Sequence, residues 1–247
     1  NMIEEEKNQF AVLIDADNIS PKYAPIIFQE LEAYGFPSCR RIYGNWSKAK
    51  VWNEELLLEY SIIPVQQFSY TSGKNATDMA MVIDAMDLLY GKKVDGFCIV
   101  TSDSDFTRLA SRLRESGMDV IGMGENKTPR SFRAACSVFT DLELLREQAH
   151  EDEPDSKHVK KKASNNIIKQ SKIENAIIEI IQENDNKGKQ TGLGEIGSRL
   201  QKKYSDFDVR NYGYSSLSTF LEEMNSLELK KFNNTVLVRL KEDKNMK

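Results

Sequence analysis

The chain has 247 residues, of which 40% are hydrophobic and 29% charged, and its formal net charge at pH 7 is -4. This composition is typical of one or two soluble globular domains, and no apolar run is long enough to cross a bilayer. The mild negative charge excludes nucleic-acid binding through bulk charge, so such binding would need local basic patches. The sequence shows no signal-peptide pattern, and we therefore expect a cytoplasmic protein without a membrane anchor.

The few cysteines and histidines exclude several kinds of catalytic and metal site. Cys39, Cys98 and Cys136 are odd in number, widely spaced and surrounded by apolar residues. They are predicted to be reduced core thiols, and not disulfides or zinc ligands. His150 and His158 both fall in one polar stretch. That position argues against a Ser-His-Asp triad, a buried histidine base or a histidine-zinc site.

Short apolar runs alternate with amphipathic stretches from residue 10 to about residue 146. The runs predicted to be strands are residues 10–14, 39–43, 62–66, 96–100, 120–123 and 138–140. The stretches predicted to be helices are residues 24–34, 49–60, 78–90 and 106–116. This alternation predicts an α/β domain over residues 8–146, with a mostly parallel sheet and helices on both faces.

The pattern changes after this domain. Residues 147–167, which contain EQAHEDEPDSKHVKKKAS, have an acidic block followed by three lysines and predict a charged, flexible linker. Residues 168–241 then show a helical pattern at 173–181, two more in GLGEIGSRLQKKY and GYSSLSTFLEEM, and a hairpin pattern in LELKKFNNTVLVRL. Three helices and a hairpin predict a small α+β domain with a winged-helix-like layout.

Acidic residues follow two of the predicted strands. FAVLIDADN ends the first strand with Asp15, Asp17 and Asn18, and IVTSDSDF ends the fourth with two hydroxyls and then Asp103 and Asp105. A single aspartate at such a place commonly caps the next helix. Parallel strands, however, place their carboxyl ends at one edge of the sheet, where ligands bind. We therefore expect these acids to form a functional site.

A third acid begins a predicted helix. In KNATDMAMVIDAMD, Asp78 follows Thr77, a candidate N-cap, and it completes the site if that helix opens at the same edge of the sheet. Asp84 and Asp87 lie further along the helix and are expected to be exposed or to act as caps. Carboxylate oxygens without histidine or cysteine suit Mg²⁺ or Mn²⁺. Such an ion would balance the crowded charge and lower the pKa of a bound water.

The sequence also contains a candidate phosphate contact after the fifth predicted strand. In KTPRSFR, Thr128 and Pro129 resemble a helix start, and Arg130 and Arg133 follow it. A helix N-terminus with two arginines fits a phosphate, although plain capping and surface charge fit as well. The chain has neither a Walker sequence nor a Rossmann glycine fingerprint, which argues against a nucleotide cofactor.

Residues 8–146 resemble the NYN domain family, a branch of the PIN-like nucleases that includes the bacterial LabA-like proteins. The resemblance rests on LIDADN, KNATDMAMVIDAMD and VTSDSDF, in that order. It implies a PIN-like three-layer sandwich and a divalent metal held by acids at strand ends. The residues implied as metal-binding and catalytic are Asp15, Asp78, Asp103 and Asp105. Asn18 matches the family's polar position after the first strand.

Residues 168–241 resemble a LOTUS domain, also called OST-HTH. The resemblance rests on NYGYSSLSTFLEEM and the hairpin LKKFNNTVLVRL. It implies a winged-helix domain that binds RNA through stacking aromatics and phosphate-binding cations. Tyr214, Leu217 and Phe220 also fit the spacing of a helical core. Across the whole chain, the residues expected to contact RNA are Lys74, Arg130, Arg133, Lys202, Lys203, Arg210, Tyr212 and Tyr214.

Taken together, these patterns predict a metal-dependent ribonuclease, with endonucleolytic hydrolysis expected, and a C-terminal RNA-binding domain. RNA is the expected partner; a homodimer and a protein partner of the C-terminal domain are left open. One alternative is an RNA- or protein-binding adaptor without turnover. The other is a haloacid-dehalogenase-like phosphatase, because LIDAD fits its DxD pair. That chemistry needs a hydroxyl after the second strand and a lysine, for which the chain offers Tyr43 and either Lys74 or Lys92.

Overall fold

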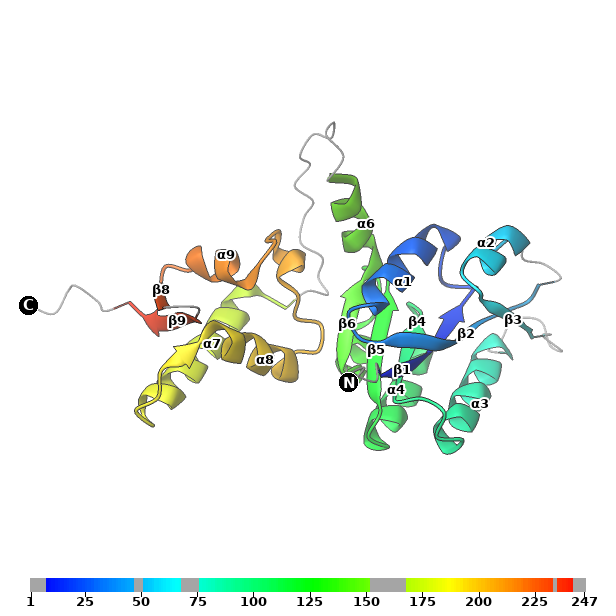
Figure 1. Ribbon diagram of the computed structural model, residues 1–247, viewed down its shortest axis with the longest axis horizontal. Helices are drawn as coiled ribbons and strands as arrows, with labels where there is room; N and C mark the ends of the chain where they lie inside the picture. Colours follow the sequence, from blue (N-terminus) through cyan, green and yellow to red (C-terminus); the bar gives the residue numbers. More distant parts are fainter. Residues whose placement is uncertain (1–7, 47–50, 68–75, 152–167, 233–234, 242–247) are drawn as a thin grey trace, which may run out of the picture. The chain divides into compact units, whose positions relative to one another are not determined.

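The computed structural model describes residues 8–46, 51–67, 76–151, 168–232 and 235–241. The chain divides into two compact units, Asn1–Val159 and Lys160–Lys247, both drawn in Figure 1. Two hydrophobic clusters lie in the first unit and one lies in the second, so each unit buries a core of its own.

The first unit is built on a six-stranded sheet, in which each neighbouring pair of strands in the described residues is parallel. The strands are β1 (Gln9–Asp15), β2 (Phe36–Gly44), β3 (Ile63–Gln66), β4 (Gly96–Val100), β5 (Asp119–Gly124) and β6 (Val138–Asp141). Their order across the sheet is β3-β2-β1-β4-β5-β6. The prediction of a mostly parallel sheet is therefore confirmed.

Helices cover both faces of this sheet and complete a three-layer sandwich. One face carries α1 (Ala24–Leu31), α2 (Glu54–Glu59) and α6 (Leu142–Glu151), and the other carries α3 (Ala76–Tyr90), α4 (Thr107–Glu115) and α5 (Arg130–Ala135). Figure 1 shows α1 and α2 on one side of the strands and α3 on the other. The predicted α/β class and PIN-like layering are thus confirmed.

The sequence of β1 shows why two layers form. Val12 and Ile14 point into the core beneath α1 and α2, whereas Ala11 and Leu13 point into the core beneath α3 and α4. All four side chains are fully buried. Side chains alternate between the two faces of a strand, so a strand covered on both faces needs a continuous apolar run.

Some element boundaries differ from those predicted. α2 begins at Glu54 because the side chain of Asn53 accepts a hydrogen bond from the backbone N–H of Leu56 (2.9 Å), which caps the helix. The predicted start of that helix, residue 49, lies outside the described residues. α6 was not predicted, and it makes residues 147–151 helical at the start of the predicted linker. The rest of that linker, residues 152–167, also lies outside the described residues.

The second unit combines helices with a small antiparallel sheet. Its elements are α7 (Gln170–Asp185), β7 (Thr191–Gly192), α8 (Leu193–Lys203), the 3-10 turn η3 (Val209–Tyr212), α9 (Leu217–Glu222), β8 (Leu227–Phe232) and β9 (Thr235–Leu240). The strands pair in the order β7-β9-β8, so the predicted hairpin is present. Among the described residues, none of the helices has both the length and the apolar character that crossing a membrane requires.

Gly96 offers a test of how tightly the amino edge of the large sheet is packed. A Cβ at this position would lie 2.4 Å from Cε1 of Phe10 and 2.9 Å from the backbone oxygen of Asp119. We expect Gly96→Ala to lower the free energy of unfolding of the first unit by about 1–3 kcal/mol, as overpacked cores do. Gly194→Ala is the control, because nothing lies within 4 Å of a Cβ there. Urea unfolding followed by circular dichroism measures both, and an unchanged midpoint for Gly96→Ala would contradict the prediction.

Candidate metal centre

The strand order changes direction beside β1. From β1 the chain moves outward to β2 and β3, whereas from β4 it moves the opposite way to β5 and β6. In open parallel sheets, ligands bind beyond the carboxyl ends of the strands at such a point. Asp15 ends β1, and the turn that contains Asp103 follows the end of β4. Both acids therefore lie at the position where this class of fold places its sites.

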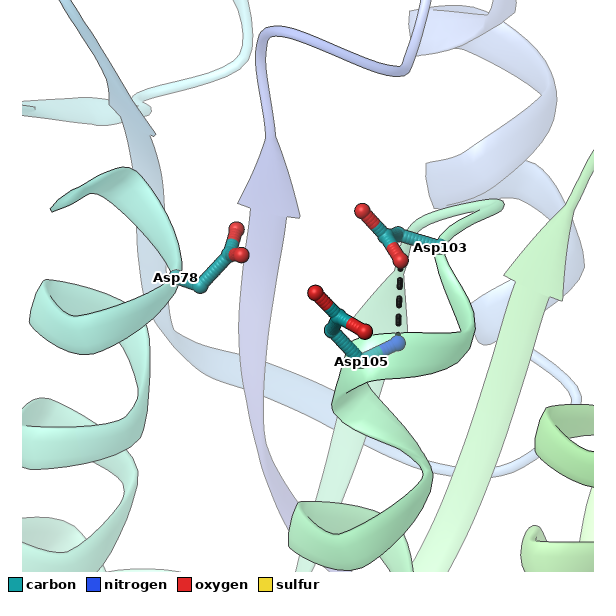
Figure 2. Close-up of side chains that lie close together, drawn as sticks. All are labelled: Asp78, Asp103 and Asp105. Carbon is teal, nitrogen blue, oxygen red and sulfur yellow. Dashed lines mark hydrogen bonds between the residues drawn. The ribbon is translucent and has the colours of Figure 1, made fainter. Parts of the chain in front are cut away.

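Three aspartates converge at this edge of the sheet. Asp78 comes from the first turn of α3, Asp103 from the turn after β4, and Asp105 from the 3-10 turn η2 (Ser104–Phe106). One carboxylate oxygen from each lies within 4.8 Å of the other two. Figure 2 shows the three side chains pointing toward one another. The structure thus brings together three of the four acids expected at the site.

Asp103 also shapes the turn that carries it. Its Oδ1 accepts a hydrogen bond from the backbone N–H of Asp105 (2.9 Å), drawn as a dashed line in Figure 2. This bond caps η2 and holds the two acids at a fixed separation. Asp103 therefore takes the capping role expected of a single aspartate, and its carboxylate also belongs to the acidic cluster.

Asp15 is not part of this group, but it is near enough for its charge to act on Asp78. It is 0% exposed, and its Oδ2 accepts hydrogen bonds from Nδ2 of Asn18 (2.7 Å) and Oγ1 of Thr101 (2.8 Å). Its Oδ1 accepts a longer bond from the backbone N–H of Asp17 (3.2 Å). Burial raises the pKa of Asp15, and the bonds from Asn18 and Thr101 oppose that rise. Asn18, expected near the site, thus binds Asp15 directly.

Asp78 is partly buried and lies among other acids. Partial burial, followed by the charges of Asp15, Asp103 and Asp105, raises its pKa to about 6. Desolvation and like charges both disfavour a carboxylate, and a bound cation reverses both effects. Three hard oxygen donors held close together therefore fit a divalent metal ion.

The other acids of α3 do not join the site. Oδ2 of Asp84 accepts hydrogen bonds from Tyr43 Oη (2.8 Å) and Arg41 Nη1 (2.8 Å). Asp84 was expected to be exposed or to act as a cap; instead it ties α3 to β2 with a half-buried side chain. Asp87 is exposed, as expected. Thr77, the candidate cap, lies where the structure describes no side chain.

The arginines after β5 have different environments. Arg133 is 1% exposed, and its guanidinium donates to the backbone oxygens of Thr128 (2.9 Å) and Asn126 (2.9 Å). It also faces Asp141 across 3.6 Å. The predicted RNA contact of Arg133 therefore does not fit the structure, because this side chain supports the loop from within. Arg130 is exposed, and Lys74 lies outside the described residues.

Most of the C-terminal residues expected to contact RNA have other contacts in the structure. Arg210 binds both carboxylate oxygens of Asp208 at 2.6–3.0 Å. The Tyr212 hydroxyl donates to the backbone oxygen of Ile168 (2.7 Å), and the rings of Tyr212 and Tyr214 pack on Phe220 at 5.0 and 5.2 Å between centroids.

The two lysines of this group lie in the last turn of α8 and are both exposed. Lys203 pairs with Glu179 (2.9 Å). Of the residues expected in RNA binding here, Lys202 and Lys203 are therefore the exposed ones, and the charge of Lys203 is paired with an acid. Tyr214 follows the alternative prediction that it packs in the core.

Two residues of the site were missed by the sequence reasoning. Thr101 is 0% exposed and donates to Asp15, and Ser102 Oγ accepts a hydrogen bond from the backbone N–H of Glu125 (2.9 Å). The available signal was two hydroxyls placed between a buried strand and two acids. A hydroxyl at that place is a ready partner for a neighbouring strand end.

The layered fold and its acidic edge define the first unit as an α/β protein of the PIN-like class. The chain belongs to the NYN domain family, because the family model described as NYN domain matches residues 9–143, more than half of the chain. A second model, OST-HTH/LOTUS domain, matches residues 169–238. The two resemblances drawn from the sequence are thereby confirmed.

Comparison with individual proteins adds little to this assignment. No curated protein matches the chain. A protein of unknown function, VPA0982 from Vibrio parahaemolyticus, is similar with 16% identity and a TM-score of 0.46, over 57% of this chain and 96% of that one. Acinetobacter baumannii MurG is similar with 12% identity and a TM-score of 0.35, over 53% of this chain and 40% of that one. Likeness at this level carries no functional argument.

Removing one carboxylate should stabilise the metal-free protein. We expect Asp78→Asn to raise the free energy of unfolding in chelator by about 1 kcal/mol, a value discounted for solvent screening, because repulsion and desolvation are relieved. Added Mn²⁺ should stabilise the wild type more than the variant. Asp87→Asn, on the exposed part of the same helix, is the control and should behave as wild type. Thermal unfolding with and without Mn²⁺ measures the stabilisation of each protein. If Mn²⁺ stabilised wild type and Asp78→Asn equally, Asp78 would not be a metal ligand.

Proposed function

We propose that this chain is a metal-dependent ribonuclease that hydrolyses RNA phosphodiester bonds, with Mg²⁺ or Mn²⁺ as its ion. The observation that carries the proposal is the cluster of Asp78, Asp103 and Asp105 at the carboxyl edge of an NYN domain. A carboxylate-only donor set matches these two ions and not zinc. The second domain, which matches the OST-HTH/LOTUS model, supports RNA as the substrate class.

Each residue has a distinct part in this proposal. Asp78, Asp103 and Asp105 hold the ion, and Asp105, the exposed member of the three, lies nearest to solvent. Asp15, held by its hydrogen bond from Asn18, supports the site without belonging to the group of three. When bound, a divalent ion lowers the pKa of a coordinated water and neutralises charge on the scissile phosphate. The acids repel RNA without it.

The C-terminal domain supplies RNA affinity in this proposal. Lys230 and Lys231 in β8 are exposed, and Phe232 at the end of the strand is 68% exposed. Side chains alternate along a strand, so Lys230 shares a face with Phe232. An exposed cation and aromatic ring on one face suit a single-stranded nucleic acid, because a phosphate meets the charge and a base stacks on the ring. Lys202, expected from the sequence to contact RNA, is a further exposed cation of this domain.

The phosphatase alternative has little support. Lys92 follows the carboxyl end of α3 and precedes β4, so it lies at the amino edge of the sheet, opposite Asp15. The hydroxyl of Tyr43 is hydrogen-bonded to Asp84. Neither group reaches the position that phosphoryl transfer to Asp15 requires, and Lys74 lies outside the described residues.

Cleavage assays test the proposed reaction. We expect labelled RNA to be cleaved with Mg²⁺ or Mn²⁺ and not with chelator, and a parallel DNA panel to define the substrate class. Asp103→Asn should lower kcat by about 100-fold or more while RNA still binds, because one metal ligand loses its charge. Asp87→Asn is the matched control and should retain activity. Wild type that binds RNA but never cleaves it would favour the adaptor alternative; trapping of a phosphoryl mimic on Asp15 would favour the phosphatase.

Deletion of residues 168–241 tests the division of labour. We expect the Michaelis constant for RNA to rise about tenfold or more with a smaller change in turnover at saturation, because uniform binding is lost. In the full chain, combined replacement of Lys230, Lys231 and Phe232 by alanine should act in the same direction. RNA binding by the domain should weaken as salt rises. If the isolated domain binds no RNA even at low salt, it is better described as a protein-docking module.

A further inference from the structure

Thr101 is the first residue after β4 and begins the turn that carries Asp103 and Asp105. Its backbone N–H donates to the carbonyl of Met123 (2.9 Å), which continues the pairing of β4 with β5 for one more residue. Its side chain is 0% exposed and reaches the other way, toward β1. There Oγ1 donates to Oδ2 of Asp15 (2.8 Å) and accepts from the backbone N–H of Asp103 (3.1 Å). One hydroxyl thus joins two acid-bearing segments that are far apart in the sequence.

We propose that Thr101 is a positioning residue of the metal centre, whose hydroxyl sets the place of Asp103 relative to Asp15. The inference rests on the proposed metal site and adds a residue that holds no metal itself. Both hydrogen-bonding functions of the hydroxyl, donor and acceptor, are engaged.

The hydrogen bonds continue from Thr101 to the rest of the cluster. Asp103, oriented through its backbone N–H, uses Oδ1 to accept from the backbone of Asp105 (2.9 Å). A shift of Asp103 therefore moves Asp105 as well. Because Asp78 comes from a separate helix, its distance to the other two acids depends on where this turn lies.

The side of the turn that faces β5 leaves little room for another arrangement. A Cβ at Gly124 would lie 2.4 Å from the backbone oxygen of Thr101, so the two backbones are in close approach. Ser102 anchors the same side by accepting from Glu125. The turn is thus confined by β5, and the bond from Thr101 determines its position toward β1.

An aliphatic residue of the same shape would remove both hydrogen bonds. Thr101→Val leaves the buried Asp15 carboxylate with one donor fewer and the Asp103 N–H without its side-chain acceptor. Buried polar groups that lose a partner relax toward other partners or water, which displaces the segment that carries them. Residues that orient metal ligands typically change affinity by about 10- to 100-fold when replaced.

The test is Mn²⁺ binding to the full chain, measured by titration calorimetry well below the unfolding temperature. We expect Thr101→Val to weaken binding by about tenfold or more, and Thr101→Ser, which keeps the hydroxyl, to remain within about threefold of wild type. Ser104→Ala removes an exposed hydroxyl from the same turn and should change nothing. Gly96→Ala, at the opposite edge of the sheet, controls for lost stability and should bind Mn²⁺ as wild type does.

The outcomes separate this inference from the proposed function. If wild type binds Mn²⁺ and Asp103→Asn does not, the metal site stands; wild-type affinity in Thr101→Val would then overturn the role of Thr101 alone. Equal losses in Thr101→Ser and Thr101→Val would overturn it too, because rescue by the hydroxyl is required. If wild type binds no Mn²⁺, both proposals fail. Should Thr101→Val not fold, Thr101→Ala is judged by the same criteria.

Discussion

Repulsion between carboxylates held close together at the carboxyl edge of the sheet is the constraint that the rest of the first unit must satisfy. Asp78, Asp103 and Asp105 present oxygens within 4.8 Å of one another. The buried Asp15 is near enough for its charge to act on Asp78. Separated carboxylates would be lower in energy, so the surrounding structure must keep them together. Burial raises the pKa of Asp78, and the charges of the neighbouring carboxylates raise it further.

Packing and hydrogen bonding far from the acids hold them in place. β1 and β4 are paired along their length and buried on both faces, which leaves their carboxyl ends no freedom to separate. On α3, Asp84 binds Tyr43 and Arg41 of β2, and this contact fixes the helix that carries Asp78. Rigid elements supported by a second layer of hydrogen bonds are what a precise metal site needs.

The two units differ in the charges that they carry. The first concentrates negative charge, whereas the second exposes cations and an aromatic ring on β8 and pairs several of its other cations with acids. A net charge of -4 for the whole chain is therefore compatible with RNA as a substrate, because local charge governs the approach of RNA more than the sum does.

The sequence by itself determined the layout of the fold and the edge that carries the site. Six short apolar runs between amphipathic stretches are enough to indicate a parallel sheet, and parallel strands necessarily place the residues after their carboxyl ends together. That is why Asp15, Asp103 and Asp105 could be assigned to one edge without coordinates. The same reasoning placed Asp78 only conditionally, because a helix start is not tied to an edge by periodicity.

Only the tertiary structure decided which polar side chains are available and which have partners within the protein. Arg133 and Arg210 look like equivalent cations in the sequence, yet one is buried under its own loop and the other binds Asp208. Thr101 meets Asp15 across 86 positions of sequence. Such contacts depend on ångström-scale distances between segments brought together by folding, and local sequence patterns carry no information on those distances.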